Sequence, residues 1–246
     1  MKIALVTGAA SGIGEAIARR LHAGGLHVVV ADIDEAGGWN VVTSLGSAAD
    51  FMRLDVTREA DWVEVIEQIR LQLGGLHVLV NNAGITTVGD IESLSLQALQ
   101  RELDINLSGP FLGCKHGIGL MKESGGSIVN IASGCSRKIR ADLVGYNASK
   151  AAVTAMSKAV ALHCAQQAYG IRVNTVHPGA IHTPILDKVL RQSGSPDALL
   201  ASFIADHPIG RIGQPEDIAA MVAFLVSEQA SFATGAEFFV DGGMTL

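Results

Sequence analysis

The sequence predicts a single α/β domain built on a doubly wound parallel sheet of about seven strands, with helices on both faces. Short apolar runs rich in β-branched residues alternate with segments of helical period along most of the chain. The runs are continuously apolar, as strands buried on both faces of a parallel sheet are. With 246 residues, 48% hydrophobic and 17% charged, and no linker-like shift in composition, residues 1–246 suffice for one large core.

The alternation can be followed from end to end. Predicted strands cover residues 3–6, 27–31, 50–54, 77–80, 127–132, 172–177 and 237–240. Helical patterns cover residues 15–23, 59–73, 151–167 and 215–227. Right-handed crossovers between parallel strands make such a sheet doubly wound, and ligands then bind beyond the carboxyl ends of its strands. The residues expected at those ends are Gly8, Asp32, Asp55, Asn81, Ser133 and Pro178.

Composition narrows the range of partners and compartments. A formal net charge of −6 opposes a general nucleic-acid surface, which needs a basic patch. No run approaches the length of a membrane span, and no secretory signal opens the chain. The three cysteines, Cys114, Cys135 and Cys164, lack metal-ligand spacing. We therefore expect a cytoplasmic protein with reduced thiols that binds neither nucleic acid nor membrane.

A glycine-rich junction joins the first strand to the first helix. Gly8, Gly12 and Gly14 follow the pattern Gly-x-x-x-Gly-x-Gly, which differs from the commoner dinucleotide fingerprint Gly-x-Gly-x-x-Gly. Glycines let the backbone approach a ligand closely, and a helix starting near Ser11 points its N–H groups at a phosphate. The alternative is a glycine-rich turn without a ligand. We favour a dinucleotide phosphate site.

Asp32 ends the second strand about 20 residues after this loop, where an acidic residue binds the ribose diol of NAD. Its carboxylate would repel a 2′-phosphate, and no Arg or Lys stands among residues 9–11 to pair with one. Both features favour NAD over NADP. The alternative is a turn residue or a helix cap, since Asp34 follows closely.

The next two strand ends carry further polar residues. Asp55 and Val56 follow the third strand, where the adenine edge is expected. Residues 81–84, Asn-Asn-Ala-Gly, end the fourth, where small residues and amides let backbone lie against a nucleoside. A plain turn also uses Asn and Gly. Two adjacent asparagines directly after a buried run favour the nucleoside.

The segment from Ser133 to Lys150 carries the chemistry. Tyr146 and Lys150 are four residues apart, so on a helix they share one face. An ammonium beside a phenol lowers the pKa of the phenol, which allows proton transfer at neutral pH. The Ser133 hydroxyl is suited to hold a carbonyl or alcohol oxygen nearby. This is chemistry for interconverting a ketone and an alcohol, and it needs a hydride carrier. Alone, Tyr-x-x-x-Lys is a weak signal, because a tyrosine early in a helix is commonly a packing residue.

Together these residues resemble the short-chain dehydrogenase/reductase family over nearly the whole chain. The likeness is carried by residues 7–14, Asp32, Asp55, residues 81–84, Asn106, Ser133, Tyr146, Lys150, Pro178, Gly179 and residues 240–243. Residues 121–127, 146–150 and 171–179 are most similar to bacterial secondary-alcohol and 3β/17β-hydroxysteroid dehydrogenases. The resemblance implies a Rossmann-type dehydrogenase domain and, commonly in the family, a homotetramer.

The resemblance also implies roles for single residues. Tyr146 would be the acid/base, Ser133 would position the substrate oxygen, and Lys150 would lower the tyrosine pKa and bind the nicotinamide ribose. Asn106 would hold a water that links Lys150 to solvent; the alternative is a polar helix residue that bends the helix by bonding backbone. The full expected coenzyme-binding set is Gly8, Ser11, Gly12, Ile13, Gly14, Asp32, Ile33, Asp55, Val56, Asn82, Ala83, Gly84, Tyr146, Lys150, Pro178, Gly179, Ile181 and Thr183.

The segment after the sixth strand matches the family's nicotinamide-carboxamide loop, with the Ile181 backbone and the Thr183 hydroxyl as contacts. A simple Pro-Gly turn is the alternative. His177 and His182 lack a third ligand and are expected to be structural, without a metal. Residues 185–208 match the family's substrate lid. Their apolar residues indicate a hydrophobic substrate, although ordinary amphipathic helices would show the same pattern.

A basic cluster, Arg137, Lys138 and Arg140, lies between Ser133 and Tyr146. We expect it to be solvated or at a subunit interface. If it faces the pocket, an acidic or phosphorylated acyl substrate becomes more favoured.

The expectation is therefore an NAD-dependent oxidoreductase that interconverts a hydrophobic secondary alcohol, a hydroxysteroid or cyclic alcohol among the candidates, and its ketone. One alternative is a 3-oxoacyl-[acyl-carrier-protein] reductase, which usually uses NADPH and is opposed by Asp32. The other is a non-catalytic dinucleotide-binding protein, opposed by the complete Ser133, Tyr146 and Lys150 set. The sequence leaves the substrate, its stereochemistry and the reaction direction open.

Overall fold

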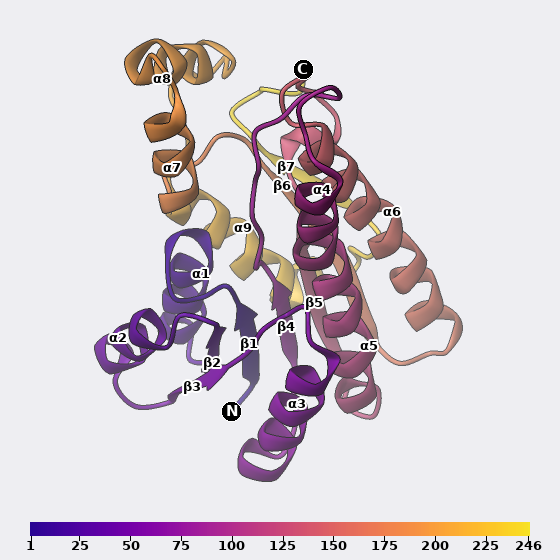
Figure 1. The fold of residues 1–246 in the computed structure, drawn as a ribbon. Helices are drawn as coiled ribbons and strands as arrows, with labels where there is room; N and C mark the ends of the chain where they lie inside the picture. Colours follow the sequence, from indigo (N-terminus) through magenta and orange to yellow (C-terminus); the bar gives the residue numbers. More distant parts are fainter.

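The computed structural model describes residues 1–246, apart from the side chain of Gln192. Across the described residues, seven parallel strands form one sheet in the order β3-β2-β1-β4-β5-β6-β7 (Figure 1). The strands are β1 (Ile3–Thr7), β2 (His27–Asp32), β3 (Ala49–Arg53), β4 (Val78–Asn81), β5 (Gly126–Ile131), β6 (Ile171–Pro178) and β7 (Glu237–Val240). The predicted fold class is confirmed.

The order of the strands reverses at β1. Leu5 of β1 pairs with Val29 of β2 on one side and with Leu79 of β4 on the other. The chain thus winds outward in both directions from β1, and the connections leave a crevice beyond the carboxyl ends of β1 and β4. This crevice is where a ligand of a doubly wound sheet is expected.

Helices cover both faces of the sheet (Figure 1). One layer contains α1 (Gly12–Ala23), α2 (Glu35–Leu45) and α9 (Pro215–Val226), and the other contains α3 (Glu59–Leu73), α5 (Gly109–Met121) and α6 (Val144–Gln166). Helix α4 (Leu96–Leu103) continues through a π-helical turn, η1 (Asp104–Ser108), into α5, and packs on α6. Helices α7 (Pro184–Gln192) and α8 (Pro196–Ala205) project from the body of the domain.

Alternation along each strand divides the core into two clusters. In β1, Ala4 and Val6 pack with α1 and α9, whereas Ile3 and Leu5 pack with the cluster around Trp62 of α3. Successive side chains of a strand point to opposite faces, so a strand covered on both sides must be apolar at every position. This explains the continuous apolar runs of the sequence.

Two helices begin earlier than their apolar pattern predicts. The apolar pattern begins only at residues 15 and 151, whereas α1 starts at Gly12, as the glycine loop predicts, and α6 starts at Val144 and so contains Tyr146 and Lys150, as expected. Their first turns contain glycines and residues that line the cavity, among them Gly12, Ile13 and Tyr146, and this interrupts the apolar helical period. Tyr146 therefore lies in the first turn of α6. Among the described residues, none of the helices is both long enough and apolar enough to cross a bilayer.

Candidate active site and coenzyme crevice

A cavity of about 900 Å³ follows the carboxyl ends of the strands. Most of the predicted site residues line it: Gly8, Ser11, Gly12, Ile13, Asp32, Ile33, Asp55, Val56, Asn82, Ala83, Gly84, Ser133, Tyr146, Lys150, Pro178, Gly179, Ile181 and Thr183. Gly14 and Asn106 do not line it. They lie behind the wall, and their contacts shape it.

The glycine loop is built for close backbone approach. Gly8 has φ 63°, and a Cβ atom there would lie 2.8 Å from the Cα of Ala83. A Cβ on Gly14 would overlap the carbonyl oxygen of Gly8. The Ser11 side chain at the start of α1 makes no capping hydrogen bond, which leaves the first helical N–H groups for a ligand. These features fit a bound phosphate.

Asp32 is held in place at the end of β2. Its carboxylate accepts hydrogen bonds from the backbone N–H groups of Ala10 and Asp34, each at 3.0 Å. The interaction with Ala10 joins β2 to the glycine loop. Asp34, not Asp32, caps α2, by accepting a hydrogen bond from Gly37. The carboxylate of Asp32 is therefore fixed at the cavity wall, as the ribose role requires.

The asparagines after β4 act as braces as well as turn residues. The Asn82 side chain donates to the carbonyl oxygens of Thr7 at 2.9 Å and Gly8 at 3.1 Å. Asn81 is buried and donates to Asn130 at 2.8 Å. The pair thus pins the glycine loop to β4 and β4 to β5, while Ala83 and Gly84 present small surfaces to the cavity.

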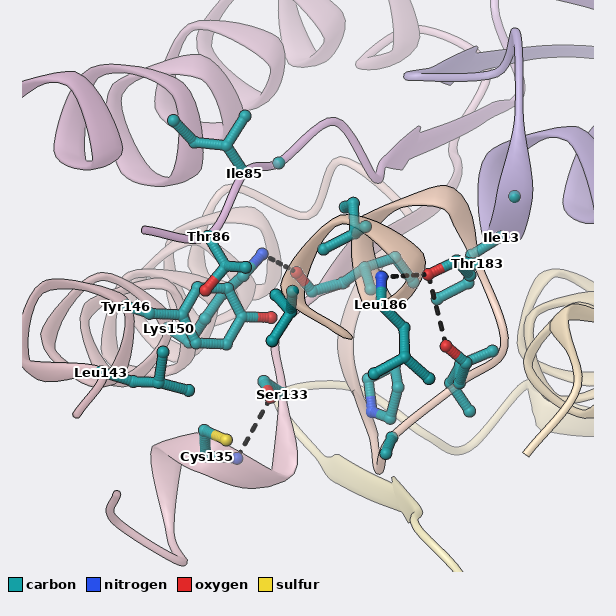
Figure 2. Close-up of a pocket in the computed structure, with 18 of the residues that line it drawn as sticks. Ile13, Ile85, Thr86, Ser133, Cys135, Leu143, Tyr146, Lys150, Thr183 and Leu186 are labelled. Atoms are coloured by element: carbon teal, nitrogen blue, oxygen red, sulfur yellow. Dashed lines mark hydrogen bonds between the residues drawn. The ribbon is translucent and has the colours of Figure 1, made fainter. Parts of the chain in front are cut away.

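Ser133, Tyr146 and Lys150 come together at one end of the crevice (Figure 2). The Ser133 hydroxyl oxygen accepts a hydrogen bond from the Cys135 N–H at 3.1 Å. Lys150 is 4% exposed, and its Nζ donates to the carbonyl oxygen of Ile131 at 2.9 Å. The same Nζ lies 5.7 Å from the centre of the Tyr146 ring. The hydroxyl, phenol and ammonium are thus fixed by β5 and by the first two turns of α6.

The electrostatics of this group differ in part from the prediction. Burial raises the pKa of Tyr146 above its ordinary value; Cys135 raises it further, the Ser133 hydroxyl lowers it, and Glu102 raises it. Burial lowers the pKa of Lys150 to about 8. The expected lowering of the tyrosine pKa by Lys150 is absent, because loss of water around the phenol outweighs other effects and the ammonium binds Ile131.

Asn106 lies in the π-helical turn η1, and its side chain binds a loop outside its own helix. Its Oδ1 accepts from the Ile85 N–H at 2.8 Å, and its Nδ2 donates to the Ile85 carbonyl oxygen at 2.9 Å and to Ser149 Oγ at 3.1 Å. A Cβ on Gly84 would lie 3.2 Å from Asn106 Oδ1 and 3.4 Å from Lys150 Nζ. Asn106 and Lys150 therefore approach Gly84 together, an arrangement compatible with the expected relay.

The carboxamide loop leads directly into α7. Thr183 is the N-cap of α7; its hydroxyl donates to the Ile181 carbonyl oxygen at 3.3 Å and accepts from the Leu186 N–H at 3.4 Å (Figure 2). His182 is exposed. Buried His177 places Nδ1 2.9 Å from Ser136 Oγ and 3.1 Å from the Ser133 carbonyl oxygen. In the described part of the chain, no group of three His, Cys, Asp or Glu residues is placed to hold a metal.

The structure corrects the expectation that the basic cluster avoids the pocket. Lys138 and Arg140 line the cavity, although Arg137 does not. Lys138 pairs with Asp206 at 3.0 Å, and Arg140 binds Asp142 at 3.0 Å and lies over Phe203. The connection from β5 to α6 passes along the cavity rim, where Lys138, Ile139 and Arg140 all line the cavity. Pairing with carboxylates largely cancels the positive charge.

Four residues that border or brace the site were not predicted: Thr86, Glu102, His207 and Met244. Thr86 and Met244 line the cavity. Glu102 and His207 are buried behind it. The one sequence signal for Glu102 is its spacing, four residues before Asn106 and so on the same helical face. The other three become neighbours of the site only through the fold.

A phosphate at the start of α1, a ribose at Asp32 and a reactive ring between Ser133 and residues 178–183 would lie in one continuous cavity. The residues present therefore fit a nicotinamide dinucleotide. With a phenol and an ammonium at the reactive end, the fold and the site define a dinucleotide-dependent oxidoreductase.

Comparison with known proteins identifies the family to which this oxidoreductase belongs. Residues 8–245 match a family model described as enoyl-(acyl carrier protein) reductase. The chain belongs to the short-chain dehydrogenase/reductase family, as its sequence motifs predicted. Members of this family bind a nicotinamide dinucleotide.

Relatives of the chain differ in substrate and coenzyme. It is 43% identical over 243 residues to a 3-beta-hydroxysteroid dehydrogenase of Comamonas testosteroni, covering 99% of this chain and 95% of the relative. It is 39% identical over 248 residues to an NADP-dependent (R)-specific alcohol dehydrogenase of Lentilactobacillus kefiri, covering 99% and 96%. A structure of 3-ketoacyl-(acyl-carrier-protein) reductase from Brucella melitensis complexed with NADH matches with TM-score 0.92 at 35% identity, covering 100% and 98%.

Proposed function

We propose that this protein is an NAD-dependent dehydrogenase that interconverts a hydrophobic secondary alcohol, such as a hydroxysteroid or a cyclic alcohol, and its ketone. The observation that carries the proposal is the position of Tyr146. Its phenol lies beside Ser133 and Lys150, where the coenzyme crevice opens into an apolar pocket. The 3-beta-hydroxysteroid dehydrogenase relative supports the substrate class.

Each side chain has a role in this reaction. The bound coenzyme supplies or accepts the hydride. Ser133 Oγ already accepts from the Cys135 N–H, so its own hydrogen is available to donate to the substrate oxygen. Tyr146 transfers the proton at that oxygen, and Lys150, whose Nζ lies 5.7 Å from the centre of the Tyr146 ring, is placed to bind the nicotinamide ribose. Asn106 and Lys150 both approach Gly84, and we assign them to the path by which the proton leaves the phenol.

The preference for NAD rests on the charges around Asp32. Its carboxylate is fixed by Ala10 and Asp34, and it faces the cavity. Arg53, its register partner on β3, pairs with Glu35 and Asp61. A 2′-phosphate would meet the carboxylate and find the nearby guanidinium already paired. Both effects disfavour NADP.

The pocket beyond Tyr146 favours an apolar substrate. Helices α7 and α8 complete the wall of this pocket. We assign the segment that contains them, residues 185–208, as a lid over the substrate. Closure of these helices would exclude water and fix the reacting carbon. The apolar side chains around this end are Val88, Leu143, Ile185, Leu186, Val189, Leu199, Phe203 and Met244.

The proposal is tested with the purified full-length chain on a panel of secondary alcohols that includes 3β-hydroxysteroids, cyclohexanol and short open-chain alcohols. Formation of NADH and of NADPH is recorded for each substrate. We expect the highest kcat/KM for a bulky apolar alcohol with NAD. Turnover confined to NADP, or to small polar alcohols, would contradict the proposal.

A 3-oxoacyl thioester reductase is the second candidate, because Lys138 and Arg140 line the pocket. Their pairing with Asp206 and Asp142 weakens this argument, since an anionic substrate would have to displace a carboxylate. Acetoacetyl thioester with NADH and with NADPH separates the two candidates. Binding of NADH without turnover of any substrate would support a non-catalytic protein instead.

A further inference from the structure

Glu102 is a buried carboxylate that the chemistry described above does not use. It lies in the last turn of α4, and its side chain is 0% exposed. Among the described residues it is the most deeply buried acidic side chain. A buried carboxylate is costly unless its interactions compensate for the lost water, so its partners indicate its purpose.

The carboxylate lies between two parts of the active site. Its Oε1 accepts a hydrogen bond from the Thr87 N–H at 2.6 Å. Its Oε2 has no hydrogen-bond partner in the described part of the chain and lies against Gly145, where a Cβ atom would overlap it. Gly145 is in the first turn of α6, directly before Tyr146. Glu102 thus joins the loop after β4 to the helix that carries the acid/base.

Asn106, which lies one helical turn after Glu102, binds the same loop. It binds both backbone groups of Ile85, while Glu102 binds the N–H of Thr87. The residue between these two attachment points is Thr86, which lines the cavity beside Tyr146 (Figure 2). Two side chains on one helical face therefore fix the pocket wall on either side of Thr86.

The charge of Glu102 also affects the pKa values of Lys150 and Tyr146. Burial raises the pKa of Glu102, while the Thr87 N–H and Lys150 lower it. Burial lowers the pKa of Lys150 to about 8, and Glu102 opposes that change. The same carboxylate raises the pKa of Tyr146. Lys150 and Tyr146 are the titratable groups that couple to it.

We propose that Glu102 is a positioning residue for the dehydrogenase reaction: its carboxylate clamps the Thr86 wall of the pocket against the first turn of α6, the helix that carries Tyr146 and Lys150. The role in catalysis rests on the proposed function. The clamp itself rests on the contacts to Thr87 and Gly145 and can be tested separately.

Three substitutions separate charge from shape. Glu102→Gln keeps the size and an oxygen for the Thr87 N–H but removes the charge. Glu102→Asp keeps the charge on a shorter side chain, and Glu102→Leu removes both. Glu92→Gln, which removes an exposed carboxylate from the same part of the chain, is the matched control.

We expect Glu102→Gln to lower kcat about tenfold and to move the alkaline limb of the kcat profile to lower pH, because Lys150 loses the charge that keeps it protonated. Glu102→Asp should keep the position of that limb. Glu102→Leu should in addition raise the KM for the alcohol, because the Thr86 wall loses its anchor. The KM for NAD should stay within about twofold in every variant.

A second measurement is independent of turnover. Because the pKa of Glu102 is raised on folding, the wild type loses stability as pH rises above the ordinary carboxyl value, 4.5, and the Gln variant does not. The difference in Tm, variant minus wild type, should therefore be more positive at about pH 8 than at about pH 5. The control should show no such trend.

The outcomes are distinct. Wild-type kcat, pH profile and alcohol KM in Glu102→Gln and Glu102→Leu would overturn the role in catalysis, as would equal shifts of the alkaline limb in the Gln and Asp variants. A Tm difference independent of pH would overturn the coupling. If the wild type turns over no alcohol but the Tm trend appears, the proposed function fails while the buried charge stands.

Discussion

His207 accepts a hydrogen bond at Nε2 from the backbone N–H of Ala180, at 3.0 Å. An N–H group can only donate, so Nε2 carries no hydrogen. Nδ1 then carries it and donates to the Phe203 carbonyl oxygen at 2.6 Å. The ring is 3% exposed and therefore ties the end of α8 to the carboxamide loop. The position of the lid and the shape of the coenzyme site depend on one neutral imidazole.

His207→Ala should raise the KM for NAD and lower the Tm. It leaves the Ala180 N–H without its acceptor, which costs roughly 1–3 kcal/mol for a buried donor. His207→Gln can return an oxygen to the Ala180 N–H and should recover part of the loss. Steady-state kinetics and NADH titration by fluorescence measure both. Equal NAD affinity in His207→Ala and the wild type would contradict this link.

Tyr146→Phe should keep coenzyme binding and lose most turnover. The phenol is the one group at the reactive end that we assign to proton transfer, an effect worth roughly 10²–10⁴-fold in kcat. The ring still fills its buried position, so Tm and the Kd for NADH should change little. Near-full activity with any alcohol of the panel would refute the assignment.

Asp32→Asn should weaken NAD binding and reduce discrimination against NADP. Asparagine can keep one acceptor for the Ala10 N–H, but it would replace the charged partner that we propose for the ribose diol by a neutral one. Charged hydrogen bonds contribute roughly 1.5–3 kcal/mol, so we expect at least about a tenfold rise in KM for NAD. Glu123→Gln, at an exposed site away from the crevice, is the control. Unchanged kcat/KM ratios for NAD and NADP would exclude Asp32 as the determinant.

The buried ammonium of Lys150 should make stability depend on alkaline pH. Its pKa falls from 10.5 to about 8 on folding, so the folded state binds fewer protons than the unfolded state between these values. Stability contributed at this residue therefore rises as pH increases from about 8 to about 10.5. The full span corresponds to about 3 kcal/mol.

Urea unfolding of the wild type and of Lys150→Met across that range measures the effect. Relative to the variant, the wild type should gain stability as pH rises. A constant difference between the two proteins would show that Lys150 does not titrate in this window.

The sequence predicts the strands of the sheet well because helices cover both faces of the sheet. Residues such as Leu5 and Val6 are buried although they point to opposite faces, so the apolar runs mark the strands almost to the residue. The predicted strand ends then place Asp32, Asn82 and Ser133 close together, because the carboxyl ends of parallel strands lie at one edge of the sheet. Apolar periodicity alone places the starts of α1 and α6 too late, since their first turns serve the cavity, and the glycine loop and the Tyr146–Lys150 spacing are needed to locate them.

The supporting residues are not predictable in the same way. A glutamate in an amphipathic helix such as α4 usually faces water, and burial of Glu102 becomes visible only when Thr87 and Gly145 are brought to it. The contact between His207 and Ala180 spans 27 residues and depends on how α7 and α8 fold back. The partners of Lys138 and Arg140 include Asp206, which the lid brings to the rim.

The hydrogen bonds from Asn82 to the glycine loop have a consequence for the order in which parts of the molecule fold. Thr7 and Asn82 are separated by 75 positions, and two α/β units lie between their strands in the sequence. Contacts between such distant segments are closed late, because loop entropy opposes them. A nascent or truncated chain that ends before Asn82 would own the phosphate-binding turn but lack its brace. Nucleotide affinity should thus appear abruptly during refolding, and excess nucleotide should protect the finished state by mass action.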